Sequence, residues 1–267
     1  MCSGSRLCRA SREPLGRSEG SQHRSSSSGG SLVTDAVRLA KRVAELKGCS
    51  RREAEQYIEG GWVTVDGVVV EEPMARVQDQ QVKIATDASL LALLPISIVL
   101  HKPVDAAPEV HPTLRASDDL SGVRAIKRHF NQLVIPSALP REASGLVVLS
   151  QDGRILRKLT EDAATTEQEL IANVAGEVTP EQVQRLCHGL TFRGQPLPPI
   201  KVSINSTGEG QTRLRFALKG VLPEHVPGLC DAVGLRLLAL KRMRLGRVSL
   251  GPLPVGQWRY LMPHERF

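Results

Sequence analysis

The sequence predicts an α+β protein in which a small two-helix module with a short sheet precedes a larger mixed domain. In the region 35–84, apolar residues at helical spacing are followed by Val-rich runs typical of short strands. From residue 96 onward, strand-like and helix-like segments interleave without a strict βαβ rhythm, which favours α+β over α/β. With 267 residues and 41% hydrophobic composition, the chain is long enough for two domains with real cores.

Residues 1–34 are rich in Ser, Gly and Arg, and such a segment cannot bury enough apolar surface to fold. Three interpretations compete: a disordered basic arm, an organelle transit peptide, or a start codon assigned too far upstream. The segment has no apolar stripe at helical spacing, so we favour the first or the third.

A first helix is predicted in the small module, residues 35–86, because Leu39, Val43 and Leu46 recur at i, i+4 and i+7. These three residues share one helical face, which we expect to be buried. Gly48 is suited to the C-terminal end of this helix.

A second helix and a hairpin are predicted next. Ser50 and Glu53 form a capping-box pattern at the start of the helix, and Gly60 ends it. The residues expected to point inward are Ala54, Tyr57 and Ile58. Residues 62–70 then predict a hairpin that turns at Asp66-Gly67, and residues 82–84 add a third strand.

The larger domain is predicted to span residues 96–263, after a linker at 87–95. Strands are expected at 97–100, 146–150, 170–174, 201–205, 213–218 and 235–243. Thr179 and Pro180 predict the cap and first position of a helix that ends before Gly189. Cys187 and His188 are adjacent near the end of this helix, where we expect a packing role.

Charge and cysteine usage limit the function classes. The formal net charge is +7 and the pI about 9.4, which indicates an anionic partner. Five scattered cysteines without a CxxC pair indicate neither a disulfide framework nor a zinc site. No apolar run is long enough for a membrane span. We therefore expect a cytoplasmic monomer with no zinc site and no membrane partner.

One face of the two-helix module is predicted to bind RNA. Its cations are Arg38, Lys41, Arg42, Lys47, Arg51 and Arg52. A merely solvated helix face would interleave acids among these bases, yet only Glu45 lies between Arg38 and Arg52.

The same module resembles the alpha-L RNA-binding motif, which is named after a small-subunit ribosomal protein. The resemblance is carried by residues 38–42 (RLAKR), 49–54 (CSRREA) and 58–67 (IEGGWVTVDG). It implies binding to structured RNA through shape and phosphate contacts.

The rest of the chain resembles the RsuA-type ribosomal-RNA pseudouridine synthases. The matching segments are 101–103 (HKP), 145–153 (GLVVLSQDG), 176–181 (GEVTPE), 232–234 (AVG), 240–246 (LKRMRLG) and 250–259 (LGPLPVGQWR). The resemblance implies isomerisation of uridine to pseudouridine without cofactor or metal. It also implies an α+β synthase fold, with ribosomal RNA as the partner. We add Lys102 of the first segment to the expected RNA contacts.

The implied reaction detaches uracil, rotates it and rejoins it through carbon. It requires a carboxylate at the glycosidic bond, an aromatic ring against the flipped base and a cation that keeps the carboxylate ionised. The family supplies these from a G-R-L-D-x-x-T-x-G-L pattern, a K-x-Y pattern and a G-R-N-x-x-V-R-R stretch.

This sequence departs from all three patterns. Aligned on Gly145, the family aspartate falls on Pro140, which offers no acid, base or nucleophile. The K-x-Y segment reads 168–170 (QEL), and the arginine-rich stretch reads 221–228 (VLPEHVPG), where Pro227 is expected to interrupt a long helix. Three separate losses indicate decay of catalysis. The catalytic residues are therefore left as unknown.

A relocated carboxylate is the alternative. Glu142 lies two residues past Pro140, a displacement of about 6–7 Å along an extended chain, and proximity effects tolerate errors of only about 1 Å. Asp118 and Asp119 lie farther upstream. Our leading hypothesis is an RNA-binding protein with little or no isomerase activity. The rival is an active synthase with a relocated carboxylate, and a protein-only assembly adaptor is a third possibility.

Overall fold

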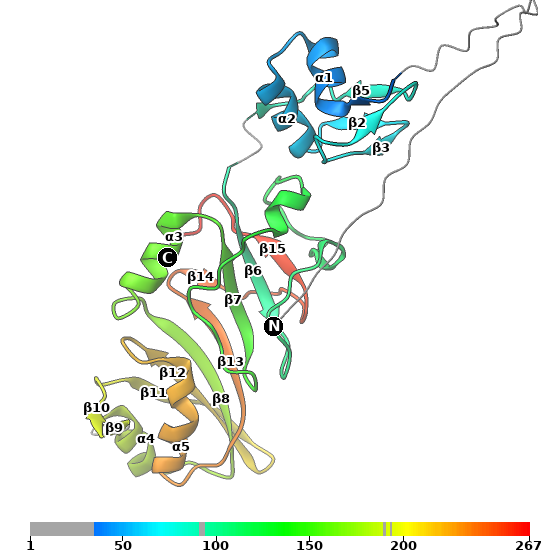
Figure 1. The fold of residues 1–267 in the computed structure, drawn as a ribbon. Coiled ribbons are helices and arrows are strands. Elements are labelled where there is room, and N and C mark those ends of the chain that lie inside the picture. Colours follow the sequence, from blue (N-terminus) through cyan, green and yellow to red (C-terminus); the bar gives the residue numbers. More distant parts are fainter. Residues whose placement is uncertain (1–34, 91–93, 189–190, 193) are drawn as a thin grey trace, which may run out of the picture. The chain divides into compact units, whose positions relative to one another are not determined.

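The structure is a computed structural model that describes residues 35–90, 94–188, 191–192 and 194–267 (Figure 1). The interpretations of residues 1–34 fall outside the described residues. Within these ranges, no helix has the length and apolar character needed to cross a membrane.

The small module contains two short helices and short antiparallel sheets. Strand β1 (Val37–Arg38) leads into α1 (Leu39–Lys47) and α2 (Arg51–Glu59). Four strands follow: β2 (Val63–Val65), β3 (Val68–Val69), β4 (Arg76–Val77) and β5 (Val82–Ile84). One sheet has the order β3-β2-β5, and β1 pairs with β4. The buried residues of this module are Leu39, Ala40, Val43, Ala54, Ile58, Val63 and Val77.

Local capping determines where both helices begin or end. Gly48 ends α1 with φ of 65°, a left-handed conformation in which glycine has no Cβ penalty. The Ser50 and Glu53 side chains each bond the other's backbone N–H, so the predicted capping box is confirmed. Leu46 is a correction: it is 51% exposed, because the core face of α1 contains Leu39 and Val43 but not the following turn.

The larger part of the chain is built on one eight-stranded mixed sheet. Its main path runs β11-β12-β8-β13-β7-β6-β15, with β14 paired to β13. The strands are β6 (Ser97–Lys102), β7 (Ser144–Ser150), β8 (Gln168–Ala175), β11 (Lys201–Gly208), β12 (Gln211–Leu218), β13 (Leu237–Leu245), β14 (Val248–Ser249) and β15 (Trp258–Tyr260). A short hairpin is formed by β9 (Thr191–Phe192) and β10 (Gln195–Pro196). The β13–β7 pair is parallel and the other pairs on the path are antiparallel.

Helices cover different parts of this sheet. Helices α4 (Pro180–Cys187) and α5 (Val226–Ala232) pack over β8, β11 and β12 through a large apolar cluster. Helix α3 (Gly153–Glu161) packs on β7 through a second cluster that contains Leu146, Val148 and Leu159. A third cluster includes Val147, Leu149, Trp258 and Tyr260. Three 3-10 turns, Pro112–Leu114, Lys127–Phe130 and Pro223–His225, connect these elements.

All six predicted strands are present. Five are longer than predicted by one to three residues at an end, and the sixth, predicted at 235–243, lies two residues later. Thr179 caps α4 and Pro180 begins it, as predicted. Gly145 has φ of 106°, and a Cβ there would lie 2.3 Å from the carbonyl oxygen of Arg242. The close approach of β7 to β13 therefore requires glycine at this position.

Candidate functional site

The first candidate site is the cationic face of the small module. All six predicted cations are exposed there. Arg38, Lys41 and Arg51 line a groove of about 570 Å³ together with Val37, Ala44 and Glu45.

Few of these cations are neutralised by acids. Arg42 lies 4.0 Å from Glu45, and Arg51 lies 3.3 Å from Glu55. Both pairs are solvated and contribute little to stability. Arg38, Lys41 and Arg52 have no ion pair within the described ranges, so their charge remains available to an anionic ligand.

Lys102 is a correction to the predicted RNA contacts. Its side chain is 2% exposed, and its ammonium group donates hydrogen bonds to three backbone carbonyls. The acceptors are Pro103 at 3.0 Å, Arg141 at 2.8 Å and Ala143 at 2.7 Å. Burial lowers the pKa of this amine, while the charges of Asp105 and Glu142 oppose that shift. Lys102 therefore holds the loop before β7 instead of facing a ligand.

The position of the family aspartate lies in that loop. Pro140 is half-buried, and its carbonyl accepts a hydrogen bond of 3.1 Å from the amide of Ala143. Its side chain carries no titratable group, so this position offers no nucleophile or base.

Nearby carboxylates are exposed or already engaged. Glu142 and Asp118 are exposed. The carboxylate of Asp119 accepts from Arg115 at 2.8 Å, from the Ser121 amide at 2.9 Å and from the Tyr260 amide at 3.2 Å. Burial raises the pKa of Asp119, but these hydrogen bonds outweigh it and hold the pKa below its usual value.

The position that the resemblance assigns to the tyrosine lies in the apolar core, whereas the positions that it assigns to arginines do not. Leu170, which replaces the family tyrosine, is fully buried. In the stretch aligned with the family arginines, the positions that match arginine are Leu222, Pro227 and Gly228, and Leu222 is 47% exposed. Pro227 does not interrupt a helix, because it lies in the first turn of the short α5, where its missing N–H has no intrahelical acceptor to lose.

Sequence reasoning missed a buried arginine at the centre of this region. The guanidinium of Arg242 is fully buried and donates to the carbonyls of Leu146 (2.7 Å) and Ser137 (2.8 Å). It also donates to the Ser137 hydroxyl (2.9 Å) and to Oε1 of Gln168 (3.0 Å). Every one of these acceptors is neutral.

Arg242 is therefore a buried cation without a carboxylate partner among the residues described. Burial lowers its pKa to about 9, so it remains charged at neutral pH. The signal for its position was present, because strand alternation from the buried Leu240 places residue 242 on the core face.

The described residues contain no group of three or more His, Cys, Asp or Glu side chains that could hold a metal ion. The cationic groove on α1 and α2 can bind an anion, whereas the region around Pro140 contains buried cations and apolar side chains, and the carboxylate of its turn, Glu142, is exposed.

Comparison with known proteins places these two regions in context. Residues 37–82 match the family model of the S4 domain. The chain is 27% identical over 241 residues to the dual-specificity RNA pseudouridine synthase RluF of Escherichia coli K12, covering 88% of this chain and 78% of that protein. It is 26% identical to ribosomal large subunit pseudouridine synthase B of Bacillus subtilis, covering 85% of this chain and 93% of that protein.

Over most of its length the chain is similar to RNA pseudouridine synthases, as the sequence resemblance predicts. A solved pseudouridylate synthase shares the fold with a TM-score of 0.50 and 20% identity, covering 85% of this chain and 96% of that one. The S4 match confirms the predicted RNA-binding domain, and the α+β architecture agrees with the synthase fold.

Proposed function

We propose that this chain binds structured RNA, including ribosomal RNA, through its S4 domain and has little or no isomerase activity. The observation that carries the proposal is the full burial of Leu170 at the position where the family resemblance implies a tyrosine, together with Pro140 where it implies the aspartate. The proposed organisation is a basic arm at 1–34, an RNA-binding domain at 35–86, a linker at 87–95 and a synthase-like domain at 96–263.

The chemistry supports this proposal. Opening a glycosidic bond requires a positioned carboxylate, and the aspartate position here is Pro140. A flipped base requires a stacking ring and space. Leu170 has no ring, and its full burial leaves no space for a base. The buried cation Arg242 is satisfied by neutral acceptors, so no carboxylate is needed to stabilise it.

RNA binding is tested by reversing two exposed cations of the S4 domain, Arg51→Glu with Arg52→Glu. We expect much weaker binding of a ribosomal-RNA stem-loop and a salt dependence whose slope falls by about 1.5, because each phosphate contact contributes about 0.7–0.9. The matched control is Arg154→Glu with Arg157→Glu, which reverses two exposed cations of α3. Equal binding by the two double variants would refute the role of the S4 face.

Catalysis is tested by mapping pseudouridine in ribosomal RNA from cells with and without the gene, using chemical tagging and reverse-transcription stops. We expect an unchanged map together with RNA that co-purifies with the protein. A site that disappears on deletion, returns with the wild-type chain and fails to return with Glu142→Ala would establish the rival, an active synthase with a relocated carboxylate.

A further inference from the structure

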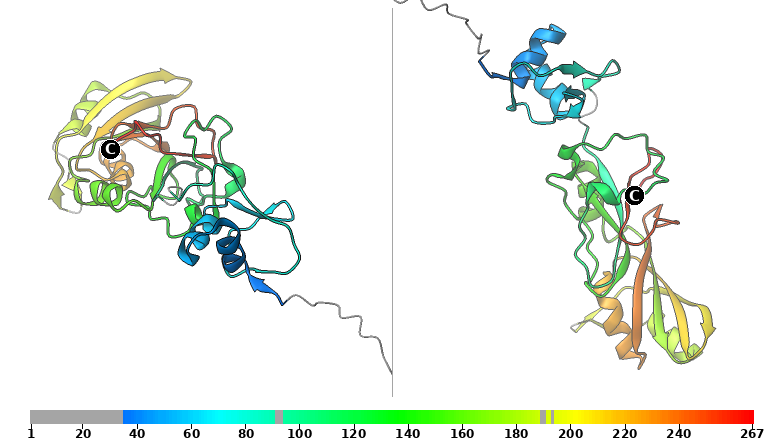
Figure 2. Two further views of the ribbon diagram at one scale, coloured as in Figure 1. Left: turned by 90° about the horizontal axis from the view of Figure 1, so that it is seen from above. Right: turned by 90° about the vertical axis from the view of Figure 1, so that its right-hand side faces the viewer.

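One surface of the large sheet is cationic and is not part of the S4 domain. Strands β8, β11, β12 and β13 pack their buried side chains, among them Leu170, Leu214 and Phe216, toward α4 and α5. Figure 2 shows both helices on one side of these strands. Side chains that alternate with the buried ones point to the opposite side, which we call the sheet face. Its cations are Lys201, Arg213, Arg215, Lys241 and Arg244.

Strand register places these cations in adjacent rows. Arg215 pairs across β12–β8 with Ile171, which pairs with Lys241 on β13. The next row contains Arg213, paired with Asn173. Neighbouring strands lie about 4.8 Å apart, so Arg215 and Lys241, two strands apart, are separated by roughly 10 Å at the backbone.

The acids near the sheet face are fewer, and two of them, Glu167 and Glu169, are paired. Glu169 accepts from Arg215 at 2.7 Å and from Arg244 at 3.4 Å, and Glu167 pairs with Arg244. The hydrogen bond from Arg215 contributes most to lowering the pKa of Glu169, which therefore stays ionised. Within the described ranges, Lys201, Arg213 and Lys241 have no ion pair. Among the residues that the structure describes, the surface thus has three cations without an ion pair, against one unpaired acid, Glu209, at the end of the β11–β12 hairpin.

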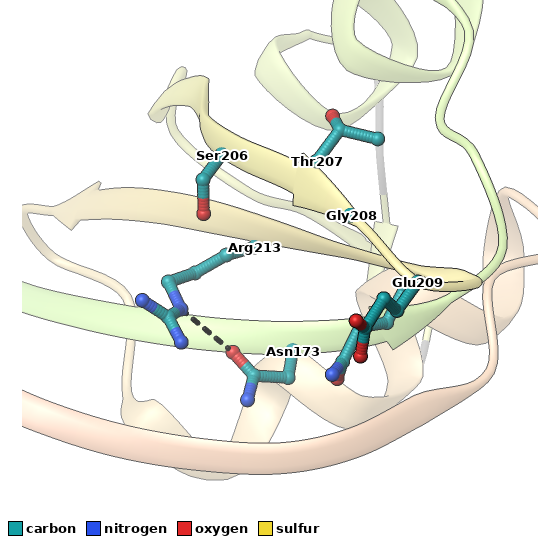
Figure 3. Close-up of a pocket in the computed structure, with 7 residues that line it drawn as sticks. Asn173, Ser206, Thr207, Gly208, Glu209 and Arg213 are labelled. Atoms are coloured by element: carbon teal, nitrogen blue, oxygen red, sulfur yellow. Dashed lines mark hydrogen bonds between the residues drawn. The ribbon is translucent and has the colours of Figure 1, made fainter.

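These cations border two adjoining hollows. One, of about 520 Å³, is lined by Ser144, Glu169, Ile171, Asn173, Asn205, Arg213, Ala239, Lys241 and Met243. The other, of about 350 Å³, shares Asn173 and Arg213 and continues to Glu209 at the end of the β11–β12 hairpin. In Figure 3 the Arg213 and Asn173 side chains point toward each other, with a hydrogen bond of 3.4 Å, and Ser206 points to the same side.

The side chains present identify the chemistry of the ligand. Arg, Lys, Ser and Asn side chains are those that contact phosphate and sugar groups. The sheet-face positions of β8, β11, β12 and β13 carry no aromatic ring, so the surface lacks the stacking platform that reads single-stranded bases. The ligand that fits is the phosphodiester backbone of RNA, bound independently of sequence.

We propose that the sheet face is a second RNA-contact surface, which binds phosphates of the RNA engaged by the S4 domain. This inference rests on the proposed function. It uses the side of the sheet opposite to Leu170 and Arg242, so it does not depend on whether any catalysis remains.

The test is a triple variant, Lys201→Gln with Arg213→Gln and Lys241→Gln, in the full chain. The control, Arg154→Gln with Arg157→Gln and Arg266→Gln, removes the same charge from exposed positions outside these strands. Affinity for a ribosomal-RNA stem-loop with single-stranded arms is measured over a range of salt concentrations. We expect the slope of log affinity against log salt to fall by about 2 in the sheet-face variant, from about 0.7 per lost phosphate contact. The slope of the control is expected to stay unchanged.

The outcomes separate this inference from the function on which it rests. A sheet-face variant with the parent slope, alongside an Arg51→Glu, Arg52→Glu variant that loses binding, overturns the inference and leaves S4 binding intact. A parent chain that does not bind the RNA overturns both. If the sheet-face variant loses binding to polyglutamate but not to RNA, the surface serves an acidic protein and the inference is wrong. Matching thermal unfolding of parent and variants confirms that the exposed substitutions leave the fold unchanged.

Discussion

Replacing Arg242 with methionine tests whether the buried guanidinium stabilises the fold through its neutral acceptors. The substitution keeps a long apolar stem and removes the charge. It leaves the carbonyls of Leu146 and Ser137 and Oε1 of Gln168 without their donor.

Two opposing effects set the size of the change. Each orphaned buried acceptor costs about 1–3 kcal/mol. Removing the buried charge recovers part of its desolvation cost, which amounts to several kcal/mol per ion. We expect the acceptors to dominate and the free energy of unfolding to fall by about 3 kcal/mol, a large share of the ~5–15 kcal/mol typical of a domain. Arg242→Met with Gln168→Met removes one orphaned acceptor and should recover about 1 kcal/mol.

The assay is urea unfolding followed by tryptophan fluorescence. A Trp62→Phe background leaves Trp258, which is fully buried in the large domain, as the only tryptophan. Its emission therefore reports the domain that contains Arg242, independently of the S4 domain. A loss below about 1 kcal/mol, or a double variant less stable than the single one, would refute the reasoning.

Three further predictions concern stability and reactivity. Burial raises the pKa of Glu265, but the two hydrogen bonds from Arg259 at 2.7 Å outweigh it. A depressed folded pKa adds stability above the usual carboxyl pKa, which is lost as the pH falls through the folded value. Glu265→Gln should therefore flatten the acid limb of a stability–pH curve, and an unchanged limb would count against the pair. Burial raises the pKa of Cys230 to about 12, so iodoacetamide should alkylate it only after denaturation, as mass spectrometry would show. Gly145→Ala should cost more than about 4 kcal/mol and abolish soluble expression, because the new Cβ meets the backbone of Arg242; a variant with the parent melting temperature would contradict this.

Features that depend on residues close together in the sequence were predictable. The capping box at Ser50 and the Pro180 helix start depend on side chains three residues apart or fewer, so their signals are local. The strands were visible because runs such as 146–150 are apolar on both faces, as expected for a strand covered on both sides.

Features that depend on distant partners were not predictable. Lys102 looked like an RNA contact because a lysine is usually exposed, but its carbonyl acceptors include residues 39 and 41 positions away. Arg242 is likewise fixed by acceptors on β7, on β8 and in the loop at Ser137. Leu46 has helical spacing, yet its side chain is 51% exposed. Periodicity gives the face of an element, and tertiary contacts decide whether that face is covered.

The burial of Leu170 in the apolar cluster also bears on whether the family tyrosine could return at this position. The other side chains of the cluster enclose Leu170, so restoring a tyrosine there would bury a bulkier and polar side chain among hydrocarbon groups. A single reversion would reduce stability before it could contribute to chemistry, and the benefit would come only after several simultaneous changes. Selection acting one substitution at a time would therefore oppose the return of this tyrosine, and lineages descended from this sequence should keep this packing.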